Sequence, residues 1–227
     1  MDKESLENGL FYFKEKNFAK ALKCFENMEN DKKYYYMGLT HVRLKDYDSA
    51  IRNLKIYLRK ETDYQLMIQI SMILGYVHVQ KSEMVKARKY FEKALQLDFN
   101  NSKAYAALGY IDFQLKNYNL SIKNLKRAIE LDQQNATAHN SLGYIYADIN
   151  MDTDQAVMEC ETALQLIPDY AMYLDSLGWA YYKKNDFTNA KKYLSMALEK
   201  NPDNQDIRKH FRDVITREMS TKKEHID

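Results

Sequence analysis

Apolar residues along this chain recur at intervals of three and four, which is the spacing of amphipathic helices. Around residue 109, one stripe consists of Tyr105, Leu108, Gly109 and Asp112, and a second stripe consists of Leu120, Ser121, Asn124, Leu125 and Ala128. This pattern predicts two helices that face each other. Related pairs of stripes recur along most of the chain, so the helix pair is the expected building block.

All six glycines hold one position in this pattern. They are Gly9, Gly38, Gly75, Gly109, Gly143 and Gly178, and successive glycines are 29, 37, 34, 34 and 35 residues apart. A glycine inside a helix costs about 1 kcal/mol relative to alanine. Close approach of two helix backbones offsets that cost, with small residues across the gap. A period near 34 residues predicts a stacked array of small units.

Other positions fall into register once the chain is aligned on the glycines. In the sixth repeat they are Leu174, Leu177, Gly178, Tyr181, Ala190, Leu194, Ala197 and Pro202. In the third repeat they are Ser71, Leu74, Gly75, His78, Ala87, Phe91 and Ala94. The pattern resembles the tetratricopeptide repeat and covers about residues 2 to 204. It departs from that family in having no leading Trp and in having the closing Pro in only two repeats.

The resemblance implies an all-α fold, namely a right-handed superhelical solenoid of six helix-turn-helix repeats in one elongated domain. The expected repeats span about 2–30, 31–67, 68–101, 102–135, 136–170 and 171–204, followed by a capping helix at 205–219 and a frayed tail at 220–227. The short first spacing predicts a second helix that ends early. The long second spacing predicts a lengthened helix or loop near residues 60–63.

Several turns inside the repeats place Asn or Asp before an aromatic residue, as in Asn17-Phe18 and Asp46-Tyr47. Asn and Asp tolerate left-handed backbone geometry and cap a following helix, so we expect them to do both here. The family usually has Gly at this bend, where this chain has Lys, Ser or Asn.

The charges are balanced, with 34 basic and 32 acidic side chains and a net charge of +2, which does not favour a nucleic-acid binder. Cys24 and Cys160 have no metal-binding spacing and are expected to be reduced, buried thiols. The amino terminus lacks the apolar stretch of a secretory signal, and the longest apolar run, residues 66–79, is too short to span a bilayer. We therefore expect a cytoplasmic protein without a membrane span.

No reaction centre can be assembled from the sequence. There is no His-x3-His, Cys-x2-Cys or carboxylate cluster with ligand spacing, and every glycine already belongs to the repeat. His41, His78 and His139 stand at positions that are aromatic in other repeats, so we expect them to pack within helix pairs. His210 and His225 fall in the capping helix and the tail. We expect no enzymatic activity, no metal and no cofactor.

The resemblance implies a concave groove lined mainly by first helices, with the residue after each glycine pointing into it. From the third repeat onward this series is Tyr76, Tyr110, Tyr144 and Trp179, and the neighbours expected on the same side are Phe113, Asn140, Asp175 and Tyr182. We expect the rings to give apolar contact to a partner protein, the polar side chains to fix polar groups, and Trp179 to be the anchor. The alternative is that the rings mainly pack on adjacent first helices.

The charges of the expected groove are uneven. Lys3, Lys14, Lys32 and Arg43 form a possible basic entrance at the first two repeats, whereas Asp148 and Asp175 lie toward the far end. A partner with an acidic part would fit the entrance, and the alternative is a solvated polar rim. The two-carboxylate clamp of chaperone-tail receptors in this family is not expected, because Leu6, Leu10, Tyr35 and Leu39 occupy the places of its Lys and Asn.

These observations favour a non-catalytic adaptor or scaffold for protein–protein interaction. One alternative is self-association through the capping helix or the aromatic series. A less favoured alternative is RNA or DNA binding by second-helix cations, namely Arg52, Lys55, Arg59, Lys123, Lys126 and Arg127, because these have acidic neighbours.

Overall fold

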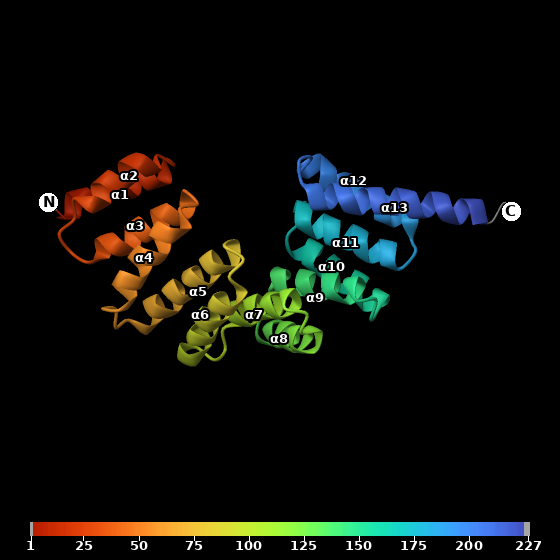
Figure 1. Ribbon diagram of the computed structural model, residues 1–227, viewed down its shortest axis with the longest axis horizontal. Helices are drawn as coiled ribbons and strands as arrows, with labels where there is room; N and C mark the ends of the chain where they lie inside the picture. Colours follow the sequence, from red (N-terminus) through yellow and green to blue (C-terminus); the bar gives the residue numbers. More distant parts are fainter. Residues whose placement is uncertain (1, 225–227) are drawn as a thin grey trace. The chain divides into compact units, whose positions relative to one another are not determined.

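The computed structural model describes residues 2–224, in which thirteen helices follow one another without a strand (Figure 1). They are α1 (Asp2–Lys14), α2 (Phe18–Glu26), α3 (Lys32–Arg43), α4 (Tyr47–Leu58), α5 (Tyr64–Gln80), α6 (Met84–Leu97), α7 (Ser102–Gln114), α8 (Tyr118–Leu131), α9 (Ala136–Asp148), α10 (Thr153–Leu166), α11 (Ala171–Lys183), α12 (Phe187–Lys200) and α13 (Gln205–Glu224). None of these described helices combines the length and the apolar character needed to cross a membrane. The predicted all-α class is confirmed.

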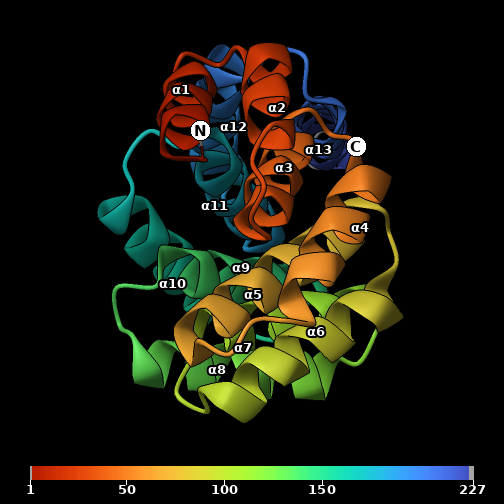
Figure 2. The same ribbon diagram turned by 90° about the vertical axis from the view of Figure 1, so that its left-hand side faces the viewer.

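The chain divides into two compact units, unit 1 up to Asn100 and unit 2 from Asn101. Unit 1 contains the pairs α1/α2, α3/α4 and α5/α6, which Figure 2 shows from the end where α1 and α2 are nearest the viewer. Unit 2 contains α7/α8, α9/α10 and α11/α12, and α13 packs against α12 and α11.

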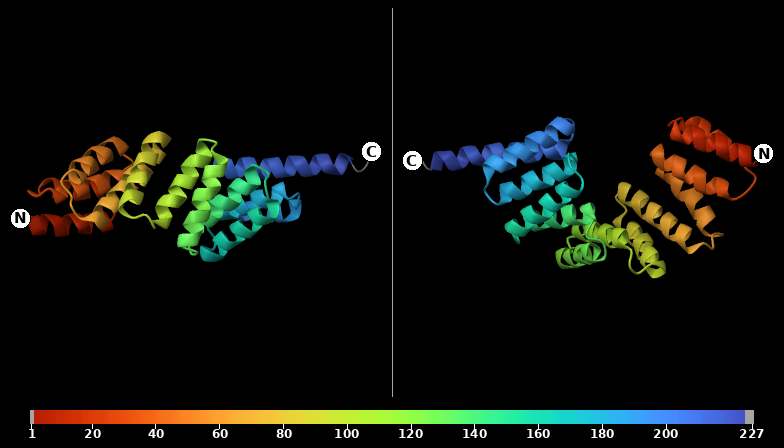
Figure 3. Two further views of the ribbon diagram at one scale, coloured as in Figure 1. Left: turned by 90° about the horizontal axis from the view of Figure 1, so that it is seen from below. Right: turned by 180° about the vertical axis from the view of Figure 1, so that it is seen from behind.

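Within each unit the pairs stack in chain order, as the right-hand view of Figure 3 shows, so each unit is an all-α helical-repeat solenoid. That the repeats act as one elongated domain stays a prediction, and the two compact units are described separately. The repeat spacing specifies each helix pair.

The six glycines lie where each first helix meets the second helix of its pair, and a Cβ added at any of them would come within 2.3–2.6 Å of a side-chain atom. The size of the facing residue sets how close the backbones come. Where it is Phe25 or Phe91, the nearest atoms all belong to the ring, and where it is leucine, backbone atoms lie 3.1–3.4 Å away. At Gly143 the facing residue is Cys160, and a Cβ would lie 2.7 Å from the carbonyl oxygen of Ala156. The smallest facing side chain therefore accompanies the closest backbones.

The turn inside each pair contains one residue in the left-handed region. These residues are Lys16, Lys45, Ser82, Lys116, Asn150 and Asn185, with φ between 54° and 63°. The following Asn17 and Asp46 accept hydrogen bonds from the backbone N–H groups of Lys20 and Ser49. Lys, Ser or Asn thus takes the left-handed conformation at the bend where the family usually has Gly, and at these two turns the next residue caps the following helix as expected.

The helix lengths follow the irregular spacings of the glycines. Helix α2 has only 9 residues, which confirms the predicted early end. Helix α5 has 17 residues and begins directly after residues 60–63, which confirms the predicted lengthened helix. Each irregularity is absorbed in one helix, so the pairing of helices is kept.

The carboxyl-terminal helix is longer than the capping helix expected at 205–219, since α13 runs to Glu224. Residues 220–224 of the expected tail are therefore helical, and residues 225–227, including His225, lie outside the described residues.

Both cysteines are free thiols. Cys160 is buried, and burial raises the pKa of its thiol. Cys24 is only half-buried, so the expectation of two buried thiols is right for Cys160 and wrong for Cys24.

Candidate functional site

The inner face of unit 2 contains a hollow of about 410 Å³, called here the unit 2 hollow. It is lined by Tyr110, Phe113 and Gln114 of α7, by Asn140, Ser141, Tyr144 and Ile145 of α9, by Met172, Asp175 and Ser176 of α11, and by Asp206, Lys209 and His210 of α13. These residues come from the first helices of three pairs and from the capping helix. The hollow thus combines aromatic and polar side chains on a concave surface, as binding sites commonly do.

Aromatic rings give this hollow its apolar surface. Tyr110 is 40% exposed, so its ring is open to a partner. The ring of Phe113 stands perpendicular to that of Tyr144, with the centroids 6.0 Å apart. Edge-to-face packing of this kind is favourable, so Phe113 holds Tyr144 in position.

His210 of α13 connects several predicted groove residues. Its Nδ1 lies 2.9 Å from Oδ1 of Asp175, and both residues are buried. Its ring stacks on Trp179 with the centroids 4.3 Å apart and lies 6.4 Å from that of Tyr144. Helix α13 is therefore a cap for the last helix pair and also a wall of the unit 2 hollow.

Five of the eight predicted groove residues line this hollow, namely Tyr110, Phe113, Asn140, Tyr144 and Asp175. Trp179 lies beside it, half-buried, with its ring 5.0 Å from that of Tyr182. Tyr76 belongs to unit 1 and lines a different hollow. Trp179 thus packs against the capping helix α13, and its expected role as the anchor for a partner stays a prediction.

Two polar atoms of predicted groove residues are buried without a hydrogen-bond partner among the described residues. They are Oδ1 of Asn140 and Nε1 of Trp179. An unmet buried donor or acceptor costs about 1–3 kcal/mol. Such groups are rare in native structures, so a polar ligand group that met them would remove this cost.

Unit 1 has a hollow of its own on its first helices. It is lined by Phe13, Leu39, Val42, Arg43, Met72, Ile73 and Tyr76. Of the predicted basic entrance, Arg43 lines this hollow, whereas Lys3, Lys14 and Lys32 are exposed elsewhere on unit 1. The structure therefore brings one of the four basic residues to an apolar surface.

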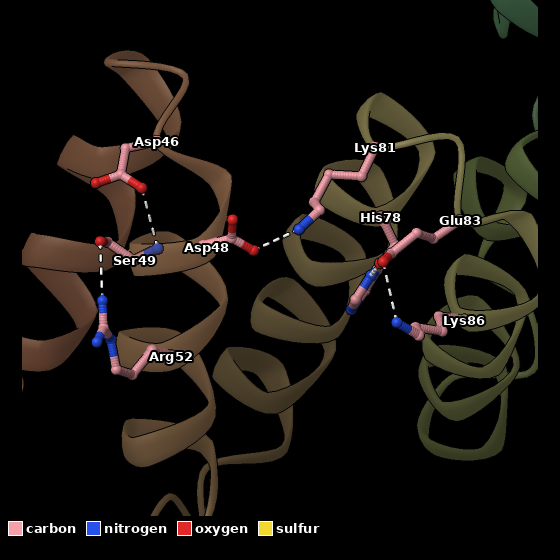
Figure 4. Close-up of polar contacts among 8 residues, drawn as sticks. All are labelled: Asp46, Asp48, Ser49, Arg52, His78, Lys81, Glu83 and Lys86. Carbon is pink, nitrogen blue, oxygen red and sulfur yellow. Dashed lines mark hydrogen bonds and ion pairs between the residues drawn. The ribbon is translucent and has the colours of Figure 1, made fainter.

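Other charged residues of unit 1 connect its helices (Figure 4). Lys81 at the end of α5 pairs with Asp48 of α4. Glu83 accepts a hydrogen bond from Lys86 at 3.0 Å and lies 2.6 Å from Nδ1 of His78. The bonds from Lys86 and then from His78 lower the pKa of Glu83 from 4.5 to about 2. This carboxylate is therefore charged at neutral pH, and it connects His78 of α5 with Lys86 of α6 at the turn between these helices.

Two of the histidines are packed within helix pairs, as predicted. His78 is buried, and its ring stacks on Tyr90 with the centroids 5.3 Å apart. His139 is also buried, and its Nδ1 lies 2.6 Å from Glu159. Within residues 2–224, no three His, Cys, Asp or Glu side chains are grouped so that they could hold a metal ion.

Several second-helix cations are engaged with neighbouring groups. Arg52 donates a hydrogen bond to the hydroxyl of Ser49 at 3.1 Å (Figure 4). Lys55 lies 5.9 Å from the centre of the Tyr90 ring, and Arg127 donates to Glu130 at 3.1 Å. These contacts leave fewer cations directed only toward solvent than the sequence alone indicates.

The contribution of α13 to the hollow was missed in the sequence, which predicted this helix as a cap and as one possible surface for self-association. A signal was present, because His210 shares its helix face with Ile207 and Val214, three and four residues away, and both of these are buried. A titratable group in the middle of an apolar stripe indicates a buried polar partner, since an unpaired polar group there is costly.

Three models of tetratricopeptide repeats together match more than half of this chain. A TPR repeat model matches residues 109–150, and two tetratricopeptide repeat models match residues 171–204 and 35–102. No curated protein sequence matches the chain.

Solved structures of similar fold include a chain of the APC/C hetero-tetramer Cut9-Hcn1, with 18% identity, a TM-score of 0.78, and coverage of 92% of this chain and 42% of that one. A MamA protein is 27% identical with a TM-score of 0.58, over 76% of this chain and 92% of that one. YrrB, described as a TPR protein with an unusual peptide-binding site, is 23% identical with a TM-score of 0.55, over 86% of this chain and 97% of its own. The present chain thus spans less than half of the Cut9-Hcn1 chain that it matches.

Proposed function

The chain belongs to the tetratricopeptide repeat family, and on that premise we propose that its unit 2 hollow binds a segment of a partner protein. Members of this family are generally non-catalytic interaction modules, with proteins or peptides as partners. The proposal adds that the chain acts as an adaptor or scaffold without a reaction of its own. It also assigns the binding to named residues on the inner helices.

The observation that carries this proposal is the gathering of repeat-related residues around one hollow. Tyr110 and Tyr144 follow Gly109 and Gly143 directly, and both rings line it. Aromatic side chains bury much area at little cost in conformational entropy, so they commonly dominate binding energy. Asn140 lies one helical turn before Tyr144 in α9 and adds a polar side chain to the same surface.

Replacing both rings tests this assignment. We expect the double variant Tyr110→Ala, Tyr144→Ala to lose partner capture by on the order of tenfold to a hundredfold, because aromatic anchors at an interface contribute about 2 kcal/mol or more. Purified wild-type and variant proteins are immobilised, incubated with extract of the source cells, and the captured proteins are quantified by mass spectrometry. Circular dichroism melting curves establish that each variant is folded.

The matched control is Tyr64→Ala, which removes a tyrosine that is 68% exposed at the start of α5 in unit 1. Proteins held by wild type and by Tyr64→Ala but lost from the double variant support the proposal. The single variant Tyr110→Ala keeps the experiment decisive if loss of both rings unfolds unit 2. Equal capture by wild type and by a folded Tyr110→Ala, Tyr144→Ala protein rejects the assignment of the hollow.

A further inference from the structure

Acidic groups gather around Tyr144 in the unit 2 hollow. Asp175 and Asp206 line the hollow together with this ring. Burial, followed by the negative charges of Asp148, Asp175 and Asp206, raises the pKa of the Tyr144 hydroxyl to about 12. All three carboxylates therefore act on the same ring, from α9, α11 and α13.

A cation of this chain already occupies the neighbouring position. The ammonium group of Lys183 lies 4.9 Å from the centre of the Trp179 ring and 3.5 Å from the carbonyl oxygen of Asp148. Cations are attracted to the faces of aromatic rings, most strongly to Trp and Tyr. Among the described residues, no Lys or Arg is placed over the rings of Tyr110 or Tyr144 in this way. These two rings and the carboxylate of Asp206 thus offer aromatic faces and a negative oxygen acceptor in the same hollow.

We propose that the unit 2 hollow receives a lysine or arginine side chain of the partner segment, with the cation against Tyr110 and Tyr144 and paired with Asp206. This inference rests on the proposed function, since it names the chemistry of the segment that the same hollow binds. The aliphatic part of either side chain would lie along Phe113 and Met172, which line the hollow as well. Long basic side chains commonly combine an apolar stem with a charged end in this manner.

An acidic partner side chain fits the hollow less well. The face of an aromatic ring is negative, so a carboxylate near Tyr110 and Tyr144 would be repelled by the rings as well as by Asp206. Among the described residues, Lys209 is the one lysine or arginine that lines the hollow. It is exposed and lies one helical turn after Asp206 on α13. The inner surface therefore favours a cation, and Lys209 reduces this preference.

Asp206 and Lys209 allow a test in which two substitutions should change the binding affinity in opposite directions. If a basic side chain binds, Asp206→Asn weakens binding by about twofold to fivefold, and Lys209→Gln strengthens it by about twofold, as expected for partly exposed charge pairs. An acidic ligand reverses both signs. The matched control is Asp203→Asn, because Asp203 precedes α13, does not line the hollow and has a side chain that is 95% exposed.

The probe is a positional-scanning peptide library, in which each pool fixes one amino acid at one position of an otherwise mixed, capped peptide. Immobilised wild type is expected to retain pools with Lys or Arg at one position over pools with Gln, Met or Glu there. This preference should fall in Asp206→Asn and in Tyr144→Ala, rise in Lys209→Gln, and stay unchanged in Asp203→Asn. A melting curve of each variant shows that it is folded.

The possible failures are distinguishable. If wild type retains peptides but prefers Asp, Glu or only apolar residues, the basic-ligand inference is overturned while the proposed function stands. The same conclusion follows if a preference for Lys or Arg is unaffected by both Asp206→Asn and Lys209→Gln. If no pool is retained above bare beads, the proposed function itself fails, and the inference fails with it.

Discussion

Gly143→Ala is expected to lower the midpoint of thermal unfolding by about 6–12 °C. The added Cβ would lie 2.6 Å from Sγ of Cys160, 2.7 Å from the carbonyl oxygen of Ala156 and 2.9 Å from the amide nitrogen of Cys160. Two of these three are backbone atoms, so α9 and α10 must separate to make room. We expect a net loss of about 3 kcal/mol, because overpacking of this kind outweighs the gain of about 1 kcal/mol from replacing a helical glycine by alanine. The measurement is thermal melting followed by circular dichroism.

Gly75→Ala is the matched comparison, since the same substitution is made at the same repeat position. There the three nearest atoms belong to the ring of Phe91, and they lie 2.6–2.8 Å from the added Cβ. A side chain can be displaced with less disturbance than a backbone, so the decrease in the melting midpoint should be clearly smaller. Equal decreases for the two variants, or an increase for Gly143→Ala, would show that backbone approach does not explain these glycines.

His210→Leu is expected to give the second large effect, a loss of about 3–5 kcal/mol in unit 2 together with faster amide hydrogen exchange in α13. Asp175 is 2% exposed, and the substitution leaves its carboxylate buried without its partner. Removing one member of a buried ionisable pair costs about this much. The stacking of the imidazole on Trp179 is lost as well, so the wall that α13 gives to the hollow should loosen.

A double variant separates the polar contact from the shape of the side chain. Replacing both partners by apolar residues removes the stranded carboxylate, so Asp175→Leu, His210→Leu should be less destabilised than His210→Leu alone. Hydrogen exchange of α13 and the melting midpoint report this difference. If the double variant is destabilised as much as His210→Leu alone, or more, the pair does not hold α13 to α11 in the way described.

The glycine positions allowed much of the fold to be predicted from the sequence. Each glycine marks one contact between two helix backbones, and the spacing of these marks specifies the pairs, the short α2 and the long α5. The strength of packing between successive pairs has no such marker, so the division after Asn100 was not predicted. The bends were visible in the sequence, because the residues with positive φ are the Lys, Ser and Asn that stand where the family usually has Gly.

The candidate site was predictable as far as the repeat register extends. Tyr110, Asn140 and Tyr144 occupy equivalent faces of first helices, and all three line the hollow. Its remaining wall comes from α13, which follows the last registered repeat and carries no glycine marker. Asp206 and His210 were therefore outside the pattern. The buried pairing of Asp175 with His210 depends on the docking of that helix, which sequence periodicity does not describe.

Site-specific photo-crosslinking tests the central claim, that the inner face of unit 2 holds the partner, most directly. A photoreactive phenylalanine derivative replaces Tyr110 in one variant and Tyr64 in another, and each is irradiated with the captured partner. Tyr110 lines the unit 2 hollow, whereas Tyr64 lies at the first position of α5 in unit 1. The account predicts a covalent adduct from position 110 and none from position 64. Adducts from position 64 alone, or none from position 110, would contradict it.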